Sequence, residues 1–242
     1  MVMAGGAVAR ASGILAERVK RIGAHLLQAD FDSVRLEDGA VHAGAASISI
    51  AEIAHVWYRR PQALPADVDP AGLEVTAGYK PKVDSGTFSY ATHAVVVAVD
   101  PGLGTVDLLD YIVVEDGGTI VNPLIADGQV FGGTAQGIGT ALYEEMPFSA
   151  DGQPMATTLG DYLLPGSTEV PPIRIEHMTT PSPFTEFGVK GLGEGGAIAP
   201  PAAIANAIND ALKGLGVTVT ETPITPRRLL AVLAAARPRS AA

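Results

Sequence analysis

The chain has 242 residues, of which 47% are hydrophobic and 17% are charged, so it has the composition of a folded protein with a substantial core and not of a disordered or fibrous one. Sixteen basic and 26 acidic residues give a net charge of −10 at pH 7, and no basic cluster interleaved with aromatic residues points to a nucleic-acid partner. Cysteine is absent, which excludes disulfides, thiolate zinc sites and iron–sulfur ligation within this chain.

The first third of the chain predicts two helices around a hairpin. A helix is predicted over about residues 7–28, because four apolar residues fall on one helical face: Leu15, Val19, Ile22 and Leu26. The dipeptide Asp38-Gly39 between two short apolar segments predicts a two-residue hairpin turn. Ser49 and Glu52 have capping-box spacing, so a second helix is predicted to start at Ser49.

The rest of the chain predicts strands followed by helices. Residues 60–82 contain four prolines and predict a connector that could wrap a partner, and residues 90–99 and 105–115 predict an antiparallel pair of strands. Helices are predicted over residues 125–146, from Pro201 to Gly214 or Gly216, and after Arg228 as far as Pro238. We therefore expect an α+β fold with helices packed on mixed or antiparallel sheets, as one domain over residues 1–242 or two lobes of about 1–80 and 81–242.

The predicted helix over residues 125–146 contains five glycines, and each costs about 0.8–1 kcal/mol relative to alanine in a helix interior. Gly132, Gly133 and Gly139 lie within about one turn of Gln136, so the helix surface around that amide carries few side chains. Either a flat ligand approaches Gln136, or the helix packs tightly on another element through its small residues. The glycines do not have the spacing of a dinucleotide fingerprint, which argues against a Rossmann fold.

A second glycine-rich segment carries a single carboxylate. Glu194 is flanked by Gly193, Gly195 and Gly196, which leave room for its side chain to enter a pocket. A general base needs this access together with partial desolvation that raises its pKa towards neutrality. The alternative is a solvated loop acid placed before a helix N-terminus, where the helix dipole favours it.

Other residues of chemical interest give weaker signals. The five histidines have no pair at metal-ligand spacing and are expected on the surface or in the core, and no Gly-x-Ser-x-Gly segment supports a serine hydrolase. Four acids stand without an evident partner in the sequence: Asp84, Asp110, Asp161 and Glu186.

Three segments together resemble one family. They are Gly-Thr-Ile-Val-Asn-Pro at residues 118–123, the glycine-rich helix at residues 128–145, and Phe-Gly-Val-Lys-Gly-Leu-Gly-Glu-Gly-Gly at residues 187–196. In this order they resemble the molybdenum hydroxylases, which include xanthine dehydrogenase, aldehyde oxidase and aerobic carbon monoxide dehydrogenase. The resemblance is to the C-terminal part of the molybdopterin-binding large subunit and covers nearly the whole chain.

The resemblance implies roles for the two motifs. Glu194 would be the catalytic general base beside molybdenum, and Gln136, with Gly133 on the same helix, would approach the molybdenum-molybdopterin cofactor, in the cytosine dinucleotide form usual in bacteria. The cofactor would be held through its pterin and phosphates, so no residue of this chain is expected to ligate the metal. The implied reaction is hydroxylation of an aldehyde or N-heteroaromatic carbon of a small molecule, with water as the oxygen source; residues 180–187 could line the substrate pocket.

The resemblance also implies partners. Large subunits of the family are much longer, so the remaining part of the large subunit, a [2Fe-2S] subunit and an FAD subunit would complete the enzyme, which would form a higher-order dimer. The chain would be either a separately encoded half or a fragment. The alternative function is a non-catalytic assembly module with the same fold. Because the sequence has no membrane-spanning run and no export signal at its start, we expect a cytoplasmic protein.

Overall fold

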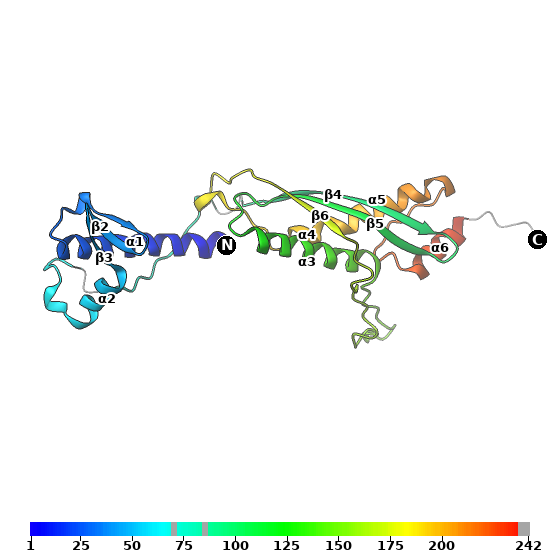
Figure 1. Cartoon of the computed structure of the whole chain (residues 1–242). Helices are drawn as coiled ribbons and strands as arrows, with labels where there is room; N and C mark the ends of the chain where they lie inside the picture. The colour runs from blue at the N-terminus through cyan, green and yellow to red at the C-terminus, as the bar shows by residue number, and fades with distance from the viewer. Residues whose placement is uncertain (69–71, 84–86, 237–242) are drawn as a thin grey trace, which may run out of the picture. The chain divides into compact units, whose positions relative to one another are not determined.

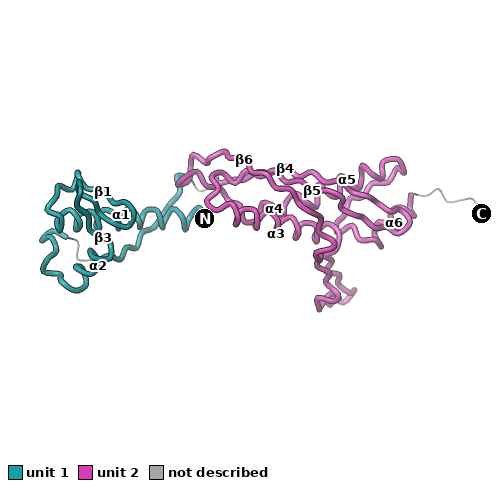
Figure 2. The backbone as a smooth tube through the Cα atoms, viewed as in Figure 1, with its two compact units in different colours: residues 1–84 teal, residues 85–242 magenta. Residues whose placement is uncertain are grey.

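The computed structural model describes residues 1–68, 72–83 and 87–236. The chain divides into two compact units, Met1–Asp84 and Ser85–Ala242, which Figure 2 shows in different colours. Each unit has its own three-stranded sheet and its own apolar core. This arrangement of helices and sheets confirms the predicted α+β class.

The first unit packs two helices against an antiparallel sheet of order β1-β2-β3. Its elements are α1 (Val2–Leu26), η1 (Phe31–Ser33), β1 (Arg35–Glu37), β2 (Ala40–Ala43), β3 (Ala46–Ser49), α2 (Ile50–Arg59) and η2 (Pro61–Ala63). The predicted first helix is confirmed but begins earlier, at Val2. The ring of Tyr79 covers Gly6, where a Cβ would come within 2.5 Å of it, so packing supports the N-terminal part of this helix.

The local signals of the first unit are confirmed. Asp38 and Gly39 both have positive φ, 46° and 74°, as the predicted hairpin turn requires. At the start of α2, the Ser49 amide donates to Glu52 Oε2 (3.0 Å) and the Glu52 amide donates to Ser49 Oγ (3.1 Å), which is the predicted capping box. The short strand β3 was not predicted. Residues 69–71 of the expected connector lie outside the described residues.

The second unit contains a mixed sheet of order β4-β5-β6 with helices packed on it (Figure 1). Its elements are β4 (Tyr90–Asp100), β5 (Thr105–Asp116), α3 (Pro123–Leu142), β6 (Ile173–Met178), η3 (Glu186–Gly188), α4 (Gly195–Ile198), α5 (Pro200–Leu212), η4 (Lys213–Leu215) and α6 (Pro226–Ala236). The predicted antiparallel pair β4–β5 is confirmed, whereas β6, which pairs with β5 in parallel, was not predicted.

A β-bulge at Leu109 sets which residues of β5 face the core. The register passes from Val96↔Asp110 to Val97↔Leu108, so Leu109 has no partner on β4 and its side chain is 60% exposed. The extra residue shifts the alternation, so that Tyr111, Val113 and Glu115 form a buried row. Tyr111 and Val113 pack with apolar residues of α3, α5 and α6, and Glu115 continues this row at the end of the strand.

The helix boundaries of the second unit follow from glycines and prolines. Helix α3 ends at Leu142 and not at residue 146, because the amides of Tyr143 and Glu144 both donate to the Gly139 carbonyl. Helix α5 begins at Pro200, and the turn after it closes at Gly216 with φ 65°. The segment between α3 and β6 extends away from the sheet (Figure 1). No helix among the described residues is long and apolar enough to cross a bilayer.

Candidate active site

The two glycine-rich segments of the sequence lie against each other. A Cβ at Gly133 of α3 would stand 3.0 Å from the backbone of Gly196 and Ala197, and one at Gly196 would stand 2.6 Å from the Val130 carbonyl oxygen. At Gly137 a Cβ would be 2.6 Å from the ring of Pro200. Larger residues at these positions would force α3 and α4 apart, so close helix packing explains these glycines.

The opposite face of α3 is open. A Cβ placed at Gly128 or at Gly132 would meet no atom of the described residues within 4 Å. Gln136, one turn after Gly132, is exposed. The glycines of α3 therefore serve two purposes: Gly133 and Gly137 permit packing on α4 and α5, while Gly128 and Gly132 leave a bare strip that leads to the Gln136 amide.

Glu194 lies at the start of α4 with its side chain exposed. Although it occupies the N-cap position, its carboxylate makes no capping hydrogen bond. The loop that carries it, residues 191–196, is held by the amide of Gly191, which donates to the Thr87 carbonyl (2.9 Å), and by Gln129 of α3, whose Nε2 donates to the Gly193 carbonyl (3.0 Å). The backbone of this loop is thus anchored while the carboxylate of Glu194 stays available.

A second carboxylate lies beneath this loop. Glu115 on β5 is 1% exposed, and neither carboxylate oxygen has a hydrogen-bond partner among the described residues. A Cβ at Gly195 would overlap Glu115 Oε1, so the side chain of Glu115 packs directly against the residue that follows Glu194. Burial raises the pKa of Glu115, and the nearby charge of His177 opposes that shift. Glu115 was not among the residues predicted from the sequence, although the in–out alternation of β5 contains the signal.

The next residue, Asp116, is buried in a different environment. Its Oδ1 accepts hydrogen bonds from the amides of Gly118 (2.9 Å) and Thr180 (3.2 Å) and pairs with Lys190 Nζ (3.1 Å). Burial alone would raise the pKa of Asp116, but these hydrogen bonds outweigh it and hold the pKa well below the usual range. The ammonium of Lys190 also lies 4.8 Å from the centre of the Tyr90 ring.

Two histidines have specific partners that the sequence did not reveal. His177 on β6 contacts Asp127 of α3 (Nε2 to Oδ1, 2.7 Å), and its buried Nδ1 has no partner among the described residues. His93 on β4 contacts the hydroxyl of Tyr111 (3.1 Å), and burial lowers its pKa. The expectation that Asp110 and Asp161 have no partner is wrong, because Asp110 forms an ion pair with Arg174 across β5 and β6 and Asp161 Oδ2 accepts from Thr158 Oγ1 (2.9 Å). Asp84 lies outside the described residues.

A cleft of about 530 Å³ opens at the other end of the sheet. It contains none of the predicted site residues Glu194, Gln136 and Gly133. Its lining comes from Gly104, Thr105, Val106, Asp107, Leu108, Leu142, Tyr143, Thr168, Glu169, Pro171, Ile224 and Pro226.

Comparison with known proteins decides the family. Residues 1–171 match the family of molybdopterin cofactor-binding domains. The chain belongs to the molybdenum hydroxylase family. It is 38% identical to the nicotine 6-hydroxylase large subunit of Paenarthrobacter nicotinovorans over 95% of the chain, and 32% identical to the carbon monoxide dehydrogenase large chain of Hydrogenophaga pseudoflava over 94%.

Solved structures of this family share the fold. Quinoline 2-oxidoreductase from Pseudomonas putida 86 superposes with a TM-score of 0.82 and 40% identity, covering 93% of this chain and 29% of that one. The chain likewise spans 28% of the length of the nicotine 6-hydroxylase large subunit and of the carbon monoxide dehydrogenase large chain. It therefore corresponds to a molybdopterin-binding portion of such large subunits.

The residues of the second unit fit a flat polar cofactor. The bare strip at Gly128 and Gly132 admits a flat group without a clash, and Gln136 presents an amide that can both donate and accept at its end. The described residues include no group of three or more histidines, aspartates and glutamates placed to hold a metal ion.

Proposed function

We propose that this chain supplies one wall of a molybdenum-cofactor site and its general base, in an enzyme that hydroxylates a carbon of a small molecule with oxygen from water. The observation that carries the proposal is the exposed, non-capping carboxylate of Glu194 on a loop anchored to the helix of Gln136. The hydrogen bond from Gln129 to Gly193 and the contact of Gly133 with Gly196 tie the two motifs into one structural unit.

The roles of the residues follow from their positions. Gln136 hydrogen-bonds the cofactor across the bare strip of α3. Gly133, which the resemblance places near the cofactor, packs against Gly196 and so contributes to the cofactor wall by bringing the Glu194 loop close to that helix. When bound, molybdenum-molybdopterin, in its cytosine dinucleotide form, supplies the oxygen-transfer and two-electron chemistry. Glu194 accepts the proton released as oxygen is transferred to the substrate carbon. Anchoring of residues 191–196 keeps its carboxylate in one place without blocking access to it.

An N-heteroaromatic ring carbon is the favoured substrate class, with an aldehyde carbon as the other. Nicotine and quinoline, the compounds in the names of two relatives that are 38% and 40% identical, are both N-heteroaromatic. The remaining part of the large subunit, a [2Fe-2S] subunit and an FAD subunit complete the electron path, which this cysteine-free chain does not contain. We place the assembled enzyme, a higher-order dimer, in the cytoplasm.

Replacement of Glu194 by Gln tests the role of the base. In the assembled enzyme, turnover should fall by about 10²–10⁴-fold, because proton transfer in the transition state is lost. Molybdenum content should stay unchanged, because the carboxamide keeps the shape of the side chain. Glu221→Gln, at another exposed glutamate of the same unit, is the matched control and should retain activity. Full turnover in Glu194→Gln would disprove the catalytic role.

Replacement of Gln136 by Ala tests the cofactor wall. We expect a lower molybdopterin content after purification and an unchanged melting temperature, because an exposed side chain contributes little to folding. Thr140→Ala, one turn later and also exposed on α3, is the control. Loss of thermal stability with full cofactor content would show that Gln136 has only a packing role. An intact complex that lacks molybdenum despite cofactor supply would instead support the non-catalytic assembly module.

A further inference from the structure

Glu115 is the buried ionisable group that the proposed chemistry leaves unused. Its carboxyl is 1% exposed, both its oxygens lack partners among the described residues, and it lies at the end of the apolar row of Tyr111 and Val113. A buried carboxyl without partners is costly in the charged form and is far less costly when protonated. The neutral form therefore suits the packed arrangement.

Gly195, in the loop of Glu194, packs against the carboxyl group of Glu115. A Cβ at Gly195 would overlap Oε1 and lie 3.1 Å from Oε2, so the Gly195 backbone is in contact with the carboxyl group. Movement of this backbone away from Glu115 would uncover the side of the carboxyl group that Gly195 contacts. Displacement of Gly195 also displaces Glu194, because the two residues are joined by one peptide bond.

We propose that Glu115 is a positioning residue: in its protonated form it supports the packed Glu194 loop, and its ionisation releases that loop. The inference deepens the proposed function and rests on it, because it makes the position of the Glu194 carboxylate depend on the charge of Glu115. The raised pKa of Glu115 agrees with the contact geometry and places the release on the alkaline side of the ordinary glutamate range.

The charged and titratable groups around Glu115 come from each neighbouring element. His177 on β6 is its register partner and is tied to Asp127 of α3. On β4, His93 lies two residues from Ala91, the register partner of Glu115 on that strand. An imidazolium at His177 would stabilise the ionised carboxyl, whereas neutral imidazole would not.

Two further charged groups lie close by in the chain. Asp116 is paired with Lys190, and Glu194 lies beside Gly195. The Lys190 ammonium pairs with Asp116, and His177 is the charged group that lowers the pKa of Glu115. Hydration is the other way to stabilise an ionised Glu115, and displacement of the Gly195 backbone opens the carboxyl group to water.

Amide hydrogen exchange in the assembled enzyme tests the coupling without relying on turnover. Above the ordinary glutamate pKa of about 4.3 and below the raised one, an opening that ionises Glu115 gains about tenfold per pH unit. After correction for intrinsic exchange, amides of residues 191–196 should show this excess slope in the wild type and lack it in Glu115→Gln. Amides of α5 should show no excess slope in either protein and serve as the internal reference.

The outcomes separate this inference from the proposed function. An equal slope for residues 191–196 and α5 in the wild type would overturn the inference, even if Glu115→Gln fails to assemble. An excess slope that persists in Glu115→Gln would overturn it too. As a second readout, the alkaline decline of kcat/KM should move or disappear in Glu115→Gln. Full turnover in Glu194→Gln would refute the catalytic role alone and leave the exchange result standing.

Discussion

Two adjacent carboxyl groups at the end of β5 have opposite environments. Glu115 and Asp116 are each 1% exposed, yet Asp116 accepts two backbone amides and the Lys190 ammonium, while Glu115 has no partner among the described residues. Burial raises the pKa of the first, and hydrogen bonds lower the pKa of the second despite its burial. Burial alone therefore does not decide the charge of a carboxyl group; its partners do.

The difference assigns the two residues different tasks. Asp116 joins the strand end to Thr180 and to Lys190, and so fixes both ends of the segment that leads into the Glu194 loop. Glu115 contacts the loop itself through Gly195 and makes no bond that would hold it. The strand end thus combines the Asp116–Lys190 ion pair with the contact between Glu115 and Gly195, which involves no hydrogen bond of the Glu115 carboxyl group among the described residues.

The largest expected effect on stability comes from breaking the Asp116–Lys190 ion pair. Lys190→Met leaves Asp116 charged and buried without its counter-ion, and removal of one partner of a buried pair costs about 3–5 kcal/mol of unfolding free energy. Arg174→Met is the matched control, because the Asp110–Arg174 pair is solvent-exposed and should contribute about 0–1 kcal/mol. Urea denaturation measures both, and equal losses in the two variants would contradict the comparison.

The partners of Asp116 also make the free energy of unfolding depend on pH. The folded pKa of Asp116 is lowered, so its contribution to stability is complete above the ordinary aspartate pKa of about 3.9 and is lost as pH falls from there towards the folded value. The free energy of unfolding of the wild type should therefore decline below about pH 4 more steeply than that of Asp116→Asn. Parallel acid limbs in the two proteins would show that the ion pair contributes no such term.

A smaller effect is expected from crowding the contact between Gly195 and Glu115. Gly195→Ala places a methyl group against Glu115, and overpacking of this kind costs about 1–3 kcal/mol. Gly193→Ala is the control on the same loop, since a Cβ there meets Gln129 at an ordinary 3.6 Å. Combining Gly195→Ala with Glu115→Ala should recover part of the loss in melting temperature. No recovery would mean that the clash lies elsewhere.

Most secondary structure was predictable because its signals are local. The turn at Asp38-Gly39, the capping box of Ser49 and Glu52, and the alternation of β4 and β5 each depend on residues a few positions apart. Strand β6 was missed because its pairing partner, β5, is distant in the sequence and parallel to it. The end of α3 was placed too late because a helical pattern continues beyond Leu142, while the Gly139 carbonyl accepts two amides that close the helix.

The site was predictable in its motifs and not in its contacts. The glycines around Gln136 and Glu194 are visible in the sequence, but spacing alone could not show that Gly133 and Gly196 face each other. Glu115 could have been suspected, since it continues the alternation of Tyr111 and Val113. Its contact with Gly195 brings together residues far apart in the chain, and only the fold reveals such a pair.

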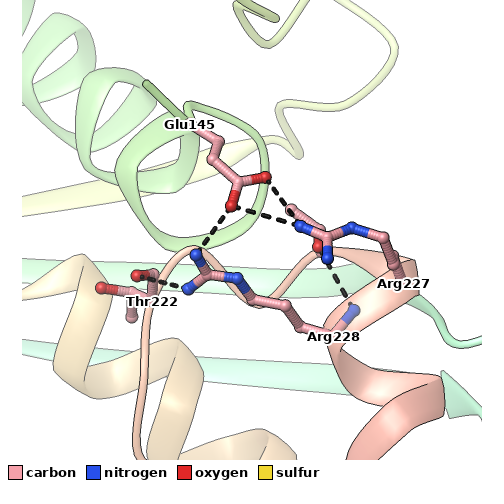
Figure 3. A network of polar contacts seen from close by, with 5 residues as sticks. Glu145, Thr222, Arg227 and Arg228 are labelled. Atoms are coloured by element: carbon pink, nitrogen blue, oxygen red, sulfur yellow. Dashed lines mark hydrogen bonds and ion pairs between the residues drawn. The ribbon is translucent and has the colours of Figure 1, made fainter. Parts of the chain in front are cut away.

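The smallest effect concerns a third carboxylate, Glu145, which lies between these extremes of environment. Figure 3 shows it facing two arginines of α6: Arg228 Nη2 lies 2.7 Å from Oε1, whereas Arg227 Nη2 lies 3.4 Å away. The Arg228 side chain is 32% exposed and also donates to the Thr222 carbonyl, while that of Arg227 is 77% exposed. Arg228 is therefore the better ordered partner.

Replacement of each arginine in turn compares the stability contributed by the short, partly buried bond of Arg228 with that contributed by the longer, exposed bond of Arg227. Arg228→Ala should lower the free energy of unfolding by about 1 kcal/mol, because it removes a short, partly buried charge-assisted bond. Arg227→Ala should change it by less than about 0.5 kcal/mol, as for other exposed pairs. Added salt should reduce the wild-type advantage over either variant, more for the exposed Arg227 than for Arg228, because screening acts most strongly on exposed charges. Equal losses in the two variants would mean that the shorter distance and lower exposure of Arg228 add nothing to its bond with Glu145.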